Sequence, residues 1–374
     1  MTQDKGLQAL ESKVIAKDDC TLCGACVSLC PYLRSAQGRI VKMHPCDLTE
    51  GRCFDYCPRT PVDLHGLHQE VFGRKYEDIE LGPLKSILMA RATDGVIREK
   101  AQTGGVVTAL VTFAIQQGII DRAVLTRRGH SLLPQGIVVS GTEDILDCAG
   151  SSYVASPTLE ALNREPPDGE QRIGVVGTPC QVLALAKMRA SRLEKRTPVG
   201  RVALTIGLFC TWALTYKPFL DYLGNRLNRK DIVKLDITPP PEGLLKVFTA
   251  EEIIEIPLDE IRPFVRPACG VCMDMTSELS DLSVGTVEGI DGWNTVIVRT
   301  ESGEELIRRA VAAGIIDDRT LPRENREHLK HASLLKKQRA LHALEERGEL
   351  NGGYLVLAPE LMETILSYPT EEGP

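Results

Sequence analysis

The sequence has no excess of positive charge and no long apolar run. Its 374 residues carry a formal net charge of −7 at pH 7, without the basic stripe of a nucleic-acid-binding protein. The longest apolar stretches, such as "RVALTIGLFCTWAL", fall short of the roughly 20 residues that a transmembrane helix needs. The first residues, "MTQDKGLQALESKV", have neither the basic nor the apolar part of a secretory signal. We therefore expect a cytoplasmic protein that binds no nucleic acid and does not insert into a membrane.

Two motifs that identify common enzyme classes are also missing. No G-x-G-x-x-G fingerprint opens a helix after an expected strand, and no Ser/His/Asp or Cys/His nucleophile pattern is apparent. Cysteine, by contrast, is abundant, with 12 residues in a chain that shows no secretory start. In a reducing cytoplasm, clustered cysteines are more often metal ligands than disulfide partners. The cysteines are therefore the first candidates for function.

The first group of cysteines is the run "CTLCGACVSLCP", which contains Cys20, Cys23, Cys26 and Cys30. This spacing is typical of bacterial ferredoxins, in which three thiolates of the run bind one 4Fe–4S cluster and the fourth binds another. Zinc sites combine two pairs of ligands, so a zinc knuckle fits the spacing poorly. The run predicts an iron–sulfur cluster in a segment that folds around its metal.

A second, less regular half follows, with Cys46 and then "CFDYCP". The pseudo-twofold symmetry of ferredoxins predicts two thiol sets, which we name the inner head set (Cys20, Cys23, Cys26 and Cys57) and the outer head set (Cys30, Cys46 and Cys53). The outer head set has only three thiolates. Its cluster either lacks a fourth ligand, as a 3Fe–4S cluster does, or takes one from a residue such as His44 or Cys148.

Three further residues near these motifs have simpler interpretations. Cys148 is expected above all to be a small buried side chain. His65 and His68 follow the cysteine-rich head, and we expect both to be polar linker residues rather than ligands.

The last four cysteines lie in the second part of the chain. They are Cys180 in "GTPCQ", Cys210 in "GLFC", and Cys269 and Cys272 in "CGVC". Cys180 follows one expected strand and Cys210 ends the next, so in a parallel sheet both could reach the crevice where α/β folds bind ligands. Convergence of all four, here named the sheet-edge set, would make a zinc site or a 4Fe–4S site. A ferredoxin-like head in the same chain favours the redox cluster, because its electrons need a destination.

Strands and helices alternate from about residue 85 onward. The expected strands are "SILMARA" (86–92), "IIDRAVLT" (119–126), "QRIGVVG" (171–177) and "GRVALTIGLFC" (200–210), with helices such as "TGGVVTALVTFAIQQG" between them. This alternation predicts an α/β domain with a mixed, largely parallel sheet, preceded by a ferredoxin-like α+β iron–sulfur domain. Short antiparallel strands are expected behind the "TPPP" break, and the last residues are expected to taper into a polar tail.

Several stretches resemble one protein family. They are "IREKAQTGGVVTALVTFAIQQGIIDRAVL", "AGSSYVASPTL", "VVGTPCQVLAL", "GLFC", "CGVCMD" and "DLSVGTVEGIDGWNTVIVRT", in the family's order over roughly residues 80–340. The chain thereby resembles the coenzyme F420 hydrogenase/dehydrogenase beta subunits, as found in F420-reducing hydrogenase and formate dehydrogenase. The family also includes the chloroplast 7-hydroxymethyl chlorophyll a reductase.

The resemblance implies a flavoprotein that binds FAD without the usual glycine fingerprint. It also implies that the flavin trades a hydride with a soluble carrier, either coenzyme F420 or NAD(P)H, and passes single electrons to an adjacent cluster. The implied flavin-binding residues are Gln102, Thr103, Gly104, Gly105, Thr108, Gly150, Ser151, Ser152, Tyr153, Ser156, Thr158, Gly177, Thr178 and Pro179. With two or three 4Fe–4S clusters, the chain would feed a partner redox subunit of hydrogenase, formate dehydrogenase or heterodisulfide-reductase type.

The sequence departs from the family at one position. Family members usually carry lysine where this chain has Ser152, which weakens the case for the highly charged coenzyme F420 and makes NAD(P)H or a partner protein more plausible. Positive charge from "LKKQR" (Lys336, Lys337 and Arg339) is one possible substitute, although a solvated helix face is the favoured interpretation of that run.

The expected organisation is therefore a ferredoxin-like 4Fe–4S domain at 1–70, an FAD-binding domain of the beta-subunit type at 80–345, and a C-terminal extension at 346–374. The favoured function is an oxidoreductase subunit of an anaerobic microbe. Two alternatives stay open, namely a stand-alone ferredoxin-linked reductase of a small organic substrate and a non-catalytic electron-transfer protein.

Overall fold

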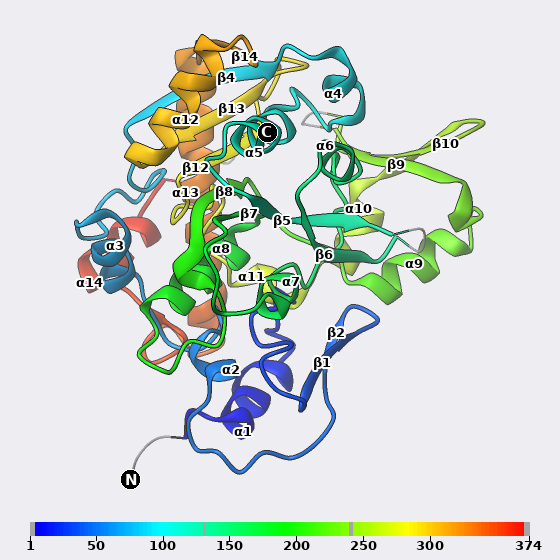
Figure 1. Ribbon diagram of the computed structural model, residues 1–374. Helices are drawn as coiled ribbons and strands as arrows, with labels where there is room; N and C mark the ends of the chain where they lie inside the picture. The colour runs from blue at the N-terminus through cyan, green and yellow to red at the C-terminus, as the bar shows by residue number, and fades with distance from the viewer. Residues whose placement is uncertain (1–3, 130–131, 239–241, 370–374) are drawn as a thin grey trace.

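A mixed sheet of eight strands forms the centre of the protein, seen in Figure 1 as a computed structural model that describes residues 4–129, 132–238 and 242–369. From one edge to the other, its strands are β14 (Ile316–Thr320), β4 (Ser86–Ala92), β13 (Asn294–Val298), β12 (Leu282–Thr286), β8 (Val202–Leu208), β7 (Ile173–Gly177), β5 (Arg122–Arg128) and β6 (Pro134–Val139).

The expectation of a largely parallel sheet holds only for its middle. Strands β12, β8, β7 and β5 pair in parallel, whereas β13, β4, β14 and β6 join through antiparallel pairings. The difference arises because β12–β13 and β5–β6 are connected directly as antiparallel neighbours rather than through crossover helices. The sheet is mixed, as the sequence predicted.

Helices cover both faces of this sheet. Val175 and Val176 are consecutive in β7 and point to opposite faces, where they join different apolar cores. One face is covered by α5 (Val106–Gln116), α6 (Thr142–Leu146) and α12 (Glu301–Ala312), and the other by α7 (Leu159–Arg164) and α8 (Pro179–Ala190). Burial on both faces explains why strands such as "IGVVG" carry no polar alternation.

A smaller antiparallel sheet extends from the side of the domain (Figure 1). Its strands are β9 (Ile232–Ile237), β10 (Leu244–Thr249) and β11 (Ile253–Pro257), and it packs against α9 (Tyr216–Gly224) and α10 (Leu258–Ile261) in one apolar core. Strands β10 and β11 are the short antiparallel strands that the sequence predicted behind the proline run, whereas β9 precedes the run and was not predicted. The proline run at 239–241 lies outside the described residues.

The cysteine-rich head lies beneath the sheet domain in Figure 1. It contains α1 (Leu7–Leu10), a π-helical turn (Glu11–Ile15), the hairpin β1 (Leu33–Ala36) and β2 (Arg39–Lys42), and α2 (Arg52–Asp55). Strand β3 (Val62–Asp63) and α3 (Leu64–Phe72) then lead to β4. The apolar core of the head is small and includes several cysteines, consistent with a segment that depends on bound metal.

The C-terminal part is more ordered than a polar tail. Helix α13 (Arg323–Glu346) runs behind the sheet, β15 (Leu355–Val356) pairs in parallel with β3, and α14 (Pro359–Leu366) packs on α13. Ile365 and Leu341 are fully buried in the core that these elements share. The tail prediction was wrong for residues up to 369, because apolar side chains at helical spacing anchor the segment. Among the described residues, no helix is both long and apolar enough to cross a membrane.

Candidate functional site

The sheet-edge set forms where two central parallel strands end. Strands β7 and β8 are neighbours, and the residues just beyond them supply Cys180 and Cys210. Cys269 lies in α11 (Pro267–Gly270), and its thiol accepts a hydrogen bond from the backbone of Ala213 at 3.3 Å. Cys272 follows in the next turn, and its backbone N–H donates to the Cys269 carbonyl. The structure thus brings four cysteines from three chain segments to one edge of the sheet.

Charge and burial distinguish the thiols of this set. Burial raises the pKa of Cys180, and the thiol of Cys272 raises it further. Burial would also raise the pKa of Cys272, but the positive charges of Lys336 and Arg59 outweigh it and lower that pKa. The site therefore favours the thiolate form that metals require, at least at Cys272.

The run "LKKQR" is not a solvated helix face at its two lysines. Lys336 and Lys337 are buried on α13, and only Arg339 is exposed. The Lys336 ammonium donates to the carbonyls of Cys210 at 2.6 Å and Asp274 at 2.8 Å, while Lys337 pairs with Glu278. The expectation failed because the helix turns these lysines toward a buried polar site, so neither can stand in for the lysine replaced by Ser152.

The inner head set is held against the sheet domain by α7. The side-chain amide of Asn163 donates to the carbonyls of Gly24, Ala25 and Val27 at 3.3, 3.0 and 2.7 Å. Gly24 has a φ of 88°, and a Cβ there would lie 2.5 Å from the carbonyl oxygen of Pro157. Only glycine therefore lets the cysteine loop approach α7 this closely.

Burial raises the pKa of every thiol in the inner head set. The four thiols also act on one another, since Cys57 and Cys20 raise the pKa of Cys23 and of Cys26. For Cys57 the pKa is about 11, because burial outweighs the opposing charge of Lys187. The structure therefore brings these four thiols together, with Cys53 also near Cys26, and their binding of one cluster stays a prediction.

The inner head set and the sheet-edge set are neighbours. Cys180 raises the pKa of both Cys20 and Cys23, and Thr21 hydrogen-bonds to the Cys180 thiol. Two metal centres at these places would lie close together, although the sets are far apart in the sequence.

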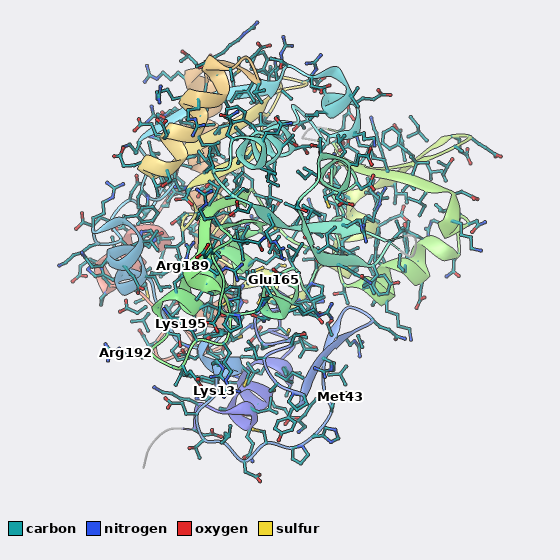
Figure 2. The ribbon with its side chains drawn as sticks, in the orientation of Figure 1. Lys13, Met43, Glu165, Arg189, Arg192 and Lys195 are labelled. Atoms are coloured by element: carbon teal, nitrogen blue, oxygen red, sulfur yellow. The ribbon has the colours of Figure 1, made fainter. Side chains whose placement is uncertain are left out.

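The outer head set lies farther out. Burial raises the pKa of Cys53 to about 12, with Cys30 and Cys46 as the neighbouring thiols. Large exposed apolar side chains flank Cys46, including Met43, which is 53% exposed at the outer side of the head (Figure 2). This set is the one that a second protein could approach.

The fourth ligand of the outer head set stays a prediction, and the two residues considered for it have other contacts. The Cys148 thiol donates to the Asp144 carbonyl at 3.2 Å beside α6 and packs on the core of the main sheet. Burial raises its pKa to about 12, with only charged side chains as the other influences. His44 is exposed and meets the ring of Tyr32 edge-on, with the centroids 6.2 Å apart.

The donor sets fit iron–sulfur cubes better than single ions. Within the described residues, no three His, Cys, Asp or Glu side chains converge tightly enough to hold one metal ion. A 4Fe–4S cube binds each thiolate at a different iron, so its thiolates stand farther apart than those around one zinc ion. All twelve cysteines lie among the described residues, and none of them forms a disulfide. Buried cations lie beside two of the sets, where they would offset the negative charge of bound clusters.

His68 is not a polar linker residue either. Its ring is fully buried between Phe72 and Tyr76, and neither ring nitrogen has a hydrogen-bond partner among the described residues. Burial lowers its pKa to about 4. It lines a cavity of about 40 Å³ together with Cys180 and Cys272. The linker folds back on the sheet-edge set, which the composition of the segment did not reveal.

The residues expected to line a flavin fall into two groups. In the first, the side-chain amide of Gln102 donates to Asp236 on β9, and the hydroxyl of Tyr153 lies 3.5 Å from the same carboxylate. Burial raises the pKa of Asp236, and Ser151 hydrogen-bonds to Tyr153. Gly150 adopts a φ of 91° at the start of this loop.

The turn before α5 belongs to the same group. Asn294, at the start of β13, donates from its amide to Thr103, and its Oδ1 would lie 2.7 Å from a Cβ on Gly104. Gly105 caps the helix with a φ of 76°, and Thr108 is buried in the first turn. The backbone here approaches its neighbours as closely as glycine allows.

In the second group, the polar atoms already hydrogen-bond to other atoms of the protein. Gln181 donates from its amide to the Ser156 carbonyl and the Thr158 hydroxyl, both at 2.9 Å. Thr178 and Gln181 form a capping box that starts α8 with Pro179 in its first turn, directly after Gly177. These residues position Cys180 as much as they line any pocket.

Sequence reasoning missed five polar residues that surround these groups. Lys187 was hidden in an apolar helix pattern, and Asp236 and Asn294 had no motif. Gln181 directly follows Cys180 in "PCQ" and Arg59 lies two residues after Cys57 in "CPRT", which was the available signal. Charged or amide residues directly beside metal-type cysteines are candidates for outer-shell contacts.

The fold and these thiol sets define an iron–sulfur α/β protein, and the comparisons with known proteins give its family. The model described as "Coenzyme F420 hydrogenase/dehydrogenase, beta subunit N-term" matches residues 87–163, its C-terminal counterpart matches 170–324, and a 4Fe–4S binding domain matches 13–33. The chain belongs to the coenzyme F420 hydrogenase/dehydrogenase beta subunit family.

Particular relatives support this membership. The coenzyme F420 hydrogenase subunit beta of Methanothermobacter thermautotrophicus is 31% identical over 72% of this chain and 97% of its own length. The corresponding beta subunit of Methanosarcina barkeri is 34% identical over 66% of this chain and 85% of its own length. A chain of the F420-reducing [NiFe] hydrogenase complex from Methanosarcina barkeri superposes with a TM-score of 0.68 at 32% identity, covering 72% of this chain and 94% of that one.

Proposed function

We propose that this protein is an FAD- and iron–sulfur-dependent oxidoreductase subunit. It exchanges a hydride with a soluble carrier in the cytoplasm and passes single electrons through 4Fe–4S clusters to a partner redox subunit. Flavin, when bound, converts the two electrons of a hydride into single electrons that clusters can carry. The relatives whose names refer to coenzyme F420 support this class of reaction.

The observation that carries the proposal is the order of the three thiol sets. The sheet-edge set adjoins the inner head set through Cys180, and the outer head set is the one beside exposed apolar side chains. Such an order supports a path from the sheet edge to the surface of the head. The partner would dock at the outer head set.

The chain's own residues would orient the flavin at the turn before α5. Gly104 and Gly105 are buried close to Asn294 and Ile97, and the Val106 N–H donates to Asn294. The other N–H groups of the first turn of α5 would face an anionic or carbonyl edge of the flavin. Gln102, Tyr153 and Asp236 form a hydrogen-bonded wall next to this turn.

Coenzyme F420 is the favoured carrier despite the serine at position 152. The Ser152 hydroxyl donates to the Val154 carbonyl and brings no charge. Lys234, whose ammonium lies 4.0 Å from Asp236 and donates to the Ala101 carbonyl at 3.4 Å, is a cation beside the same wall. We assign to Lys234 the attraction of an anionic carrier that the missing lysine would otherwise provide.

The test is anaerobic purification followed by reduction with reduced coenzyme F420, NADH and NADPH in turn. We expect iron, sulfide and FAD in the preparation, and bleaching of the flavin fastest with reduced F420. A colourless protein that holds zinc and no flavin would refute the proposal. Bleaching by NADPH alone would mean that the hydride carrier is NADPH and not coenzyme F420. Turnover of a small substrate without any co-purifying subunit would favour the stand-alone reductase.

A further inference from the structure

Arg59 occupies a special place between two thiol sets. It follows Cys57 and Pro58 directly, is only 5% exposed, and donates its backbone N–H to the Cys57 thiol at 3.4 Å. Its guanidinium donates to the Ala268 carbonyl at 2.9 Å, next to Cys269, and packs on the ring of Tyr354 at 4.8 Å. The side chain therefore extends from the inner head set to the loop of the sheet-edge set.

The charge of Arg59 acts on thiols of both sets. It lowers the pKa of Cys20 and Cys57 against the larger effect of burial, and it does the same at Cys180. It also hydrogen-bonds to the thiol of Cys272. Its Nε is buried and has no acceptor among the described residues, so one donor remains for a bound group.

Of the other buried cations nearby, Arg266 donates to the Cys20 carbonyl at 2.7 Å from the loop that carries Cys269, whereas two lysines each serve a single set. Lys187 donates to the Cys57 carbonyl at 2.7 Å, and the thiols that act on it are Cys57 and Cys23 of the inner head set. Lys336 donates to the Cys210 carbonyl, and the thiols that act on it are Cys272, Cys210 and Cys269 of the sheet-edge set. These two lysines are therefore matched controls for Arg59.

We propose that Arg59 is a positioning residue whose fixed charge raises the reduction potentials of both adjacent clusters together, so that the difference between the two potentials stays nearly unchanged. This inference rests on the proposed function, because it requires clusters in both sets. One electron leaves the donor cluster and one enters the acceptor, while Arg59 keeps its proton because guanidinium does not deprotonate in proteins. Net charge and hydrogen bonds to sulfur are established determinants of cluster potential.

The test is a redox titration of the anaerobic holoprotein followed by electron paramagnetic resonance, with iron and flavin content measured in parallel. Lys187→Met is expected to lower one midpoint potential and Lys336→Met another, which assigns the two signals. Arg59→Gln is expected to lower both midpoint potentials. Each should fall by about 59 mV, which is a tenfold change in a one-electron reduction equilibrium. Arg59→Lys, which keeps the charge, is expected to leave both potentials closer to wild type.

Each outcome decides between the ideas. A shift of only one potential, or of neither, in a fully loaded Arg59→Gln protein overturns the inference, as does an equal shift in Arg59→Lys. Loss of iron in both Arg59 variants would assign a merely structural role and also overturn it. Wild-type protein without iron would instead refute the proposed function.

Discussion

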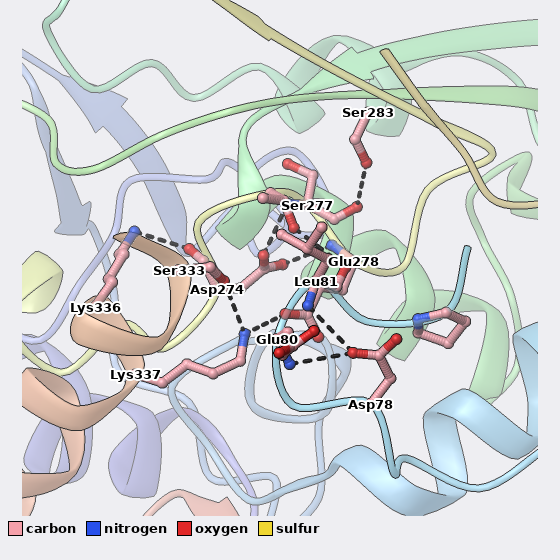
Figure 3. Close-up of polar contacts among 12 residues, drawn as sticks. Asp78, Glu80, Leu81, Asp274, Ser277, Glu278, Ser283, Ser333, Lys336 and Lys337 are labelled. Carbon is pink, nitrogen blue, oxygen red and sulfur yellow. Dashed lines mark hydrogen bonds and ion pairs between the residues drawn. The ribbon is translucent and has the colours of Figure 1, made fainter. Parts of the chain in front are cut away.

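The ion pair between Lys337 and Glu278 should be essential for stability because it is almost fully buried. Their side chains are 1% and 6% exposed, and Figure 3 shows the pair beside Asp274 and Ser333. Replacing Lys337 with methionine would leave Glu278 buried without its ion-pair partner, next to the carboxylate of Asp274. Breaking such a pair typically costs about 3–5 kcal/mol, a large share of the roughly 5–15 kcal/mol that stabilises a domain.

A urea titration of the anaerobic protein, followed by circular dichroism, measures this loss. We expect Lys337→Met to lower the unfolding midpoint strongly, and Lys337→Met combined with Glu278→Leu to recover most of it, because the second change removes the stranded charge. Lys85→Met is the matched control, since it breaks an exposed pair with Glu301 and should change little. A single variant as stable as wild type, or a double variant worse than the single one, would refute the reasoning.

Three further outcomes are expected. Gly24→Ala should lose iron from the head because its Cβ meets the Pro157 carbonyl, whereas Gly348→Ala, also at positive φ but with open space around it, should retain iron in the same assay. Burial lowers the pKa of His68 to about 4, so on acidification the unfolded chain binds this proton before the folded protein does. The free energy of unfolding, fully present above about pH 6.5, should therefore fall by about 1 kcal/mol between pH 7.5 and 5.5. Thermal unfolding of His68→Phe should lack this part of the pH dependence. Ser152→Lys should lower the KM for reduced coenzyme F420 and leave that for NADH unchanged, and equal changes in both would contradict a role for charge at this position.

Spacing along the sequence indicated the cysteine run from Cys20 to Cys30 because ligands on one loop are a local feature. The strand ends that carry Cys180 and Cys210 could also be predicted, since alternating strands and helices imply a common edge. The polar surroundings could not be predicted, because they come from distant segments. Lys336 lies on a helix whose composition suggests solvent exposure, and only the packing of α13 turns it toward Cys210.

The head does not meet the sheet domain as an independent ferredoxin module would. The carbonyl of Cys20 accepts from the guanidinium of Arg266 at 2.7 Å, and Lys187 donates to the carbonyls of Cys57 and Pro61 at 2.7 and 3.0 Å. Together with the amide contacts of Asn163, these bonds satisfy the backbone of the cysteine loops with side chains from the sheet domain. The loops would lose these partners in isolation, and buried polar groups without partners are costly. We therefore expect the inner head set to assemble only when the sheet domain is present, so that electron transfer and folding depend on the same contacts.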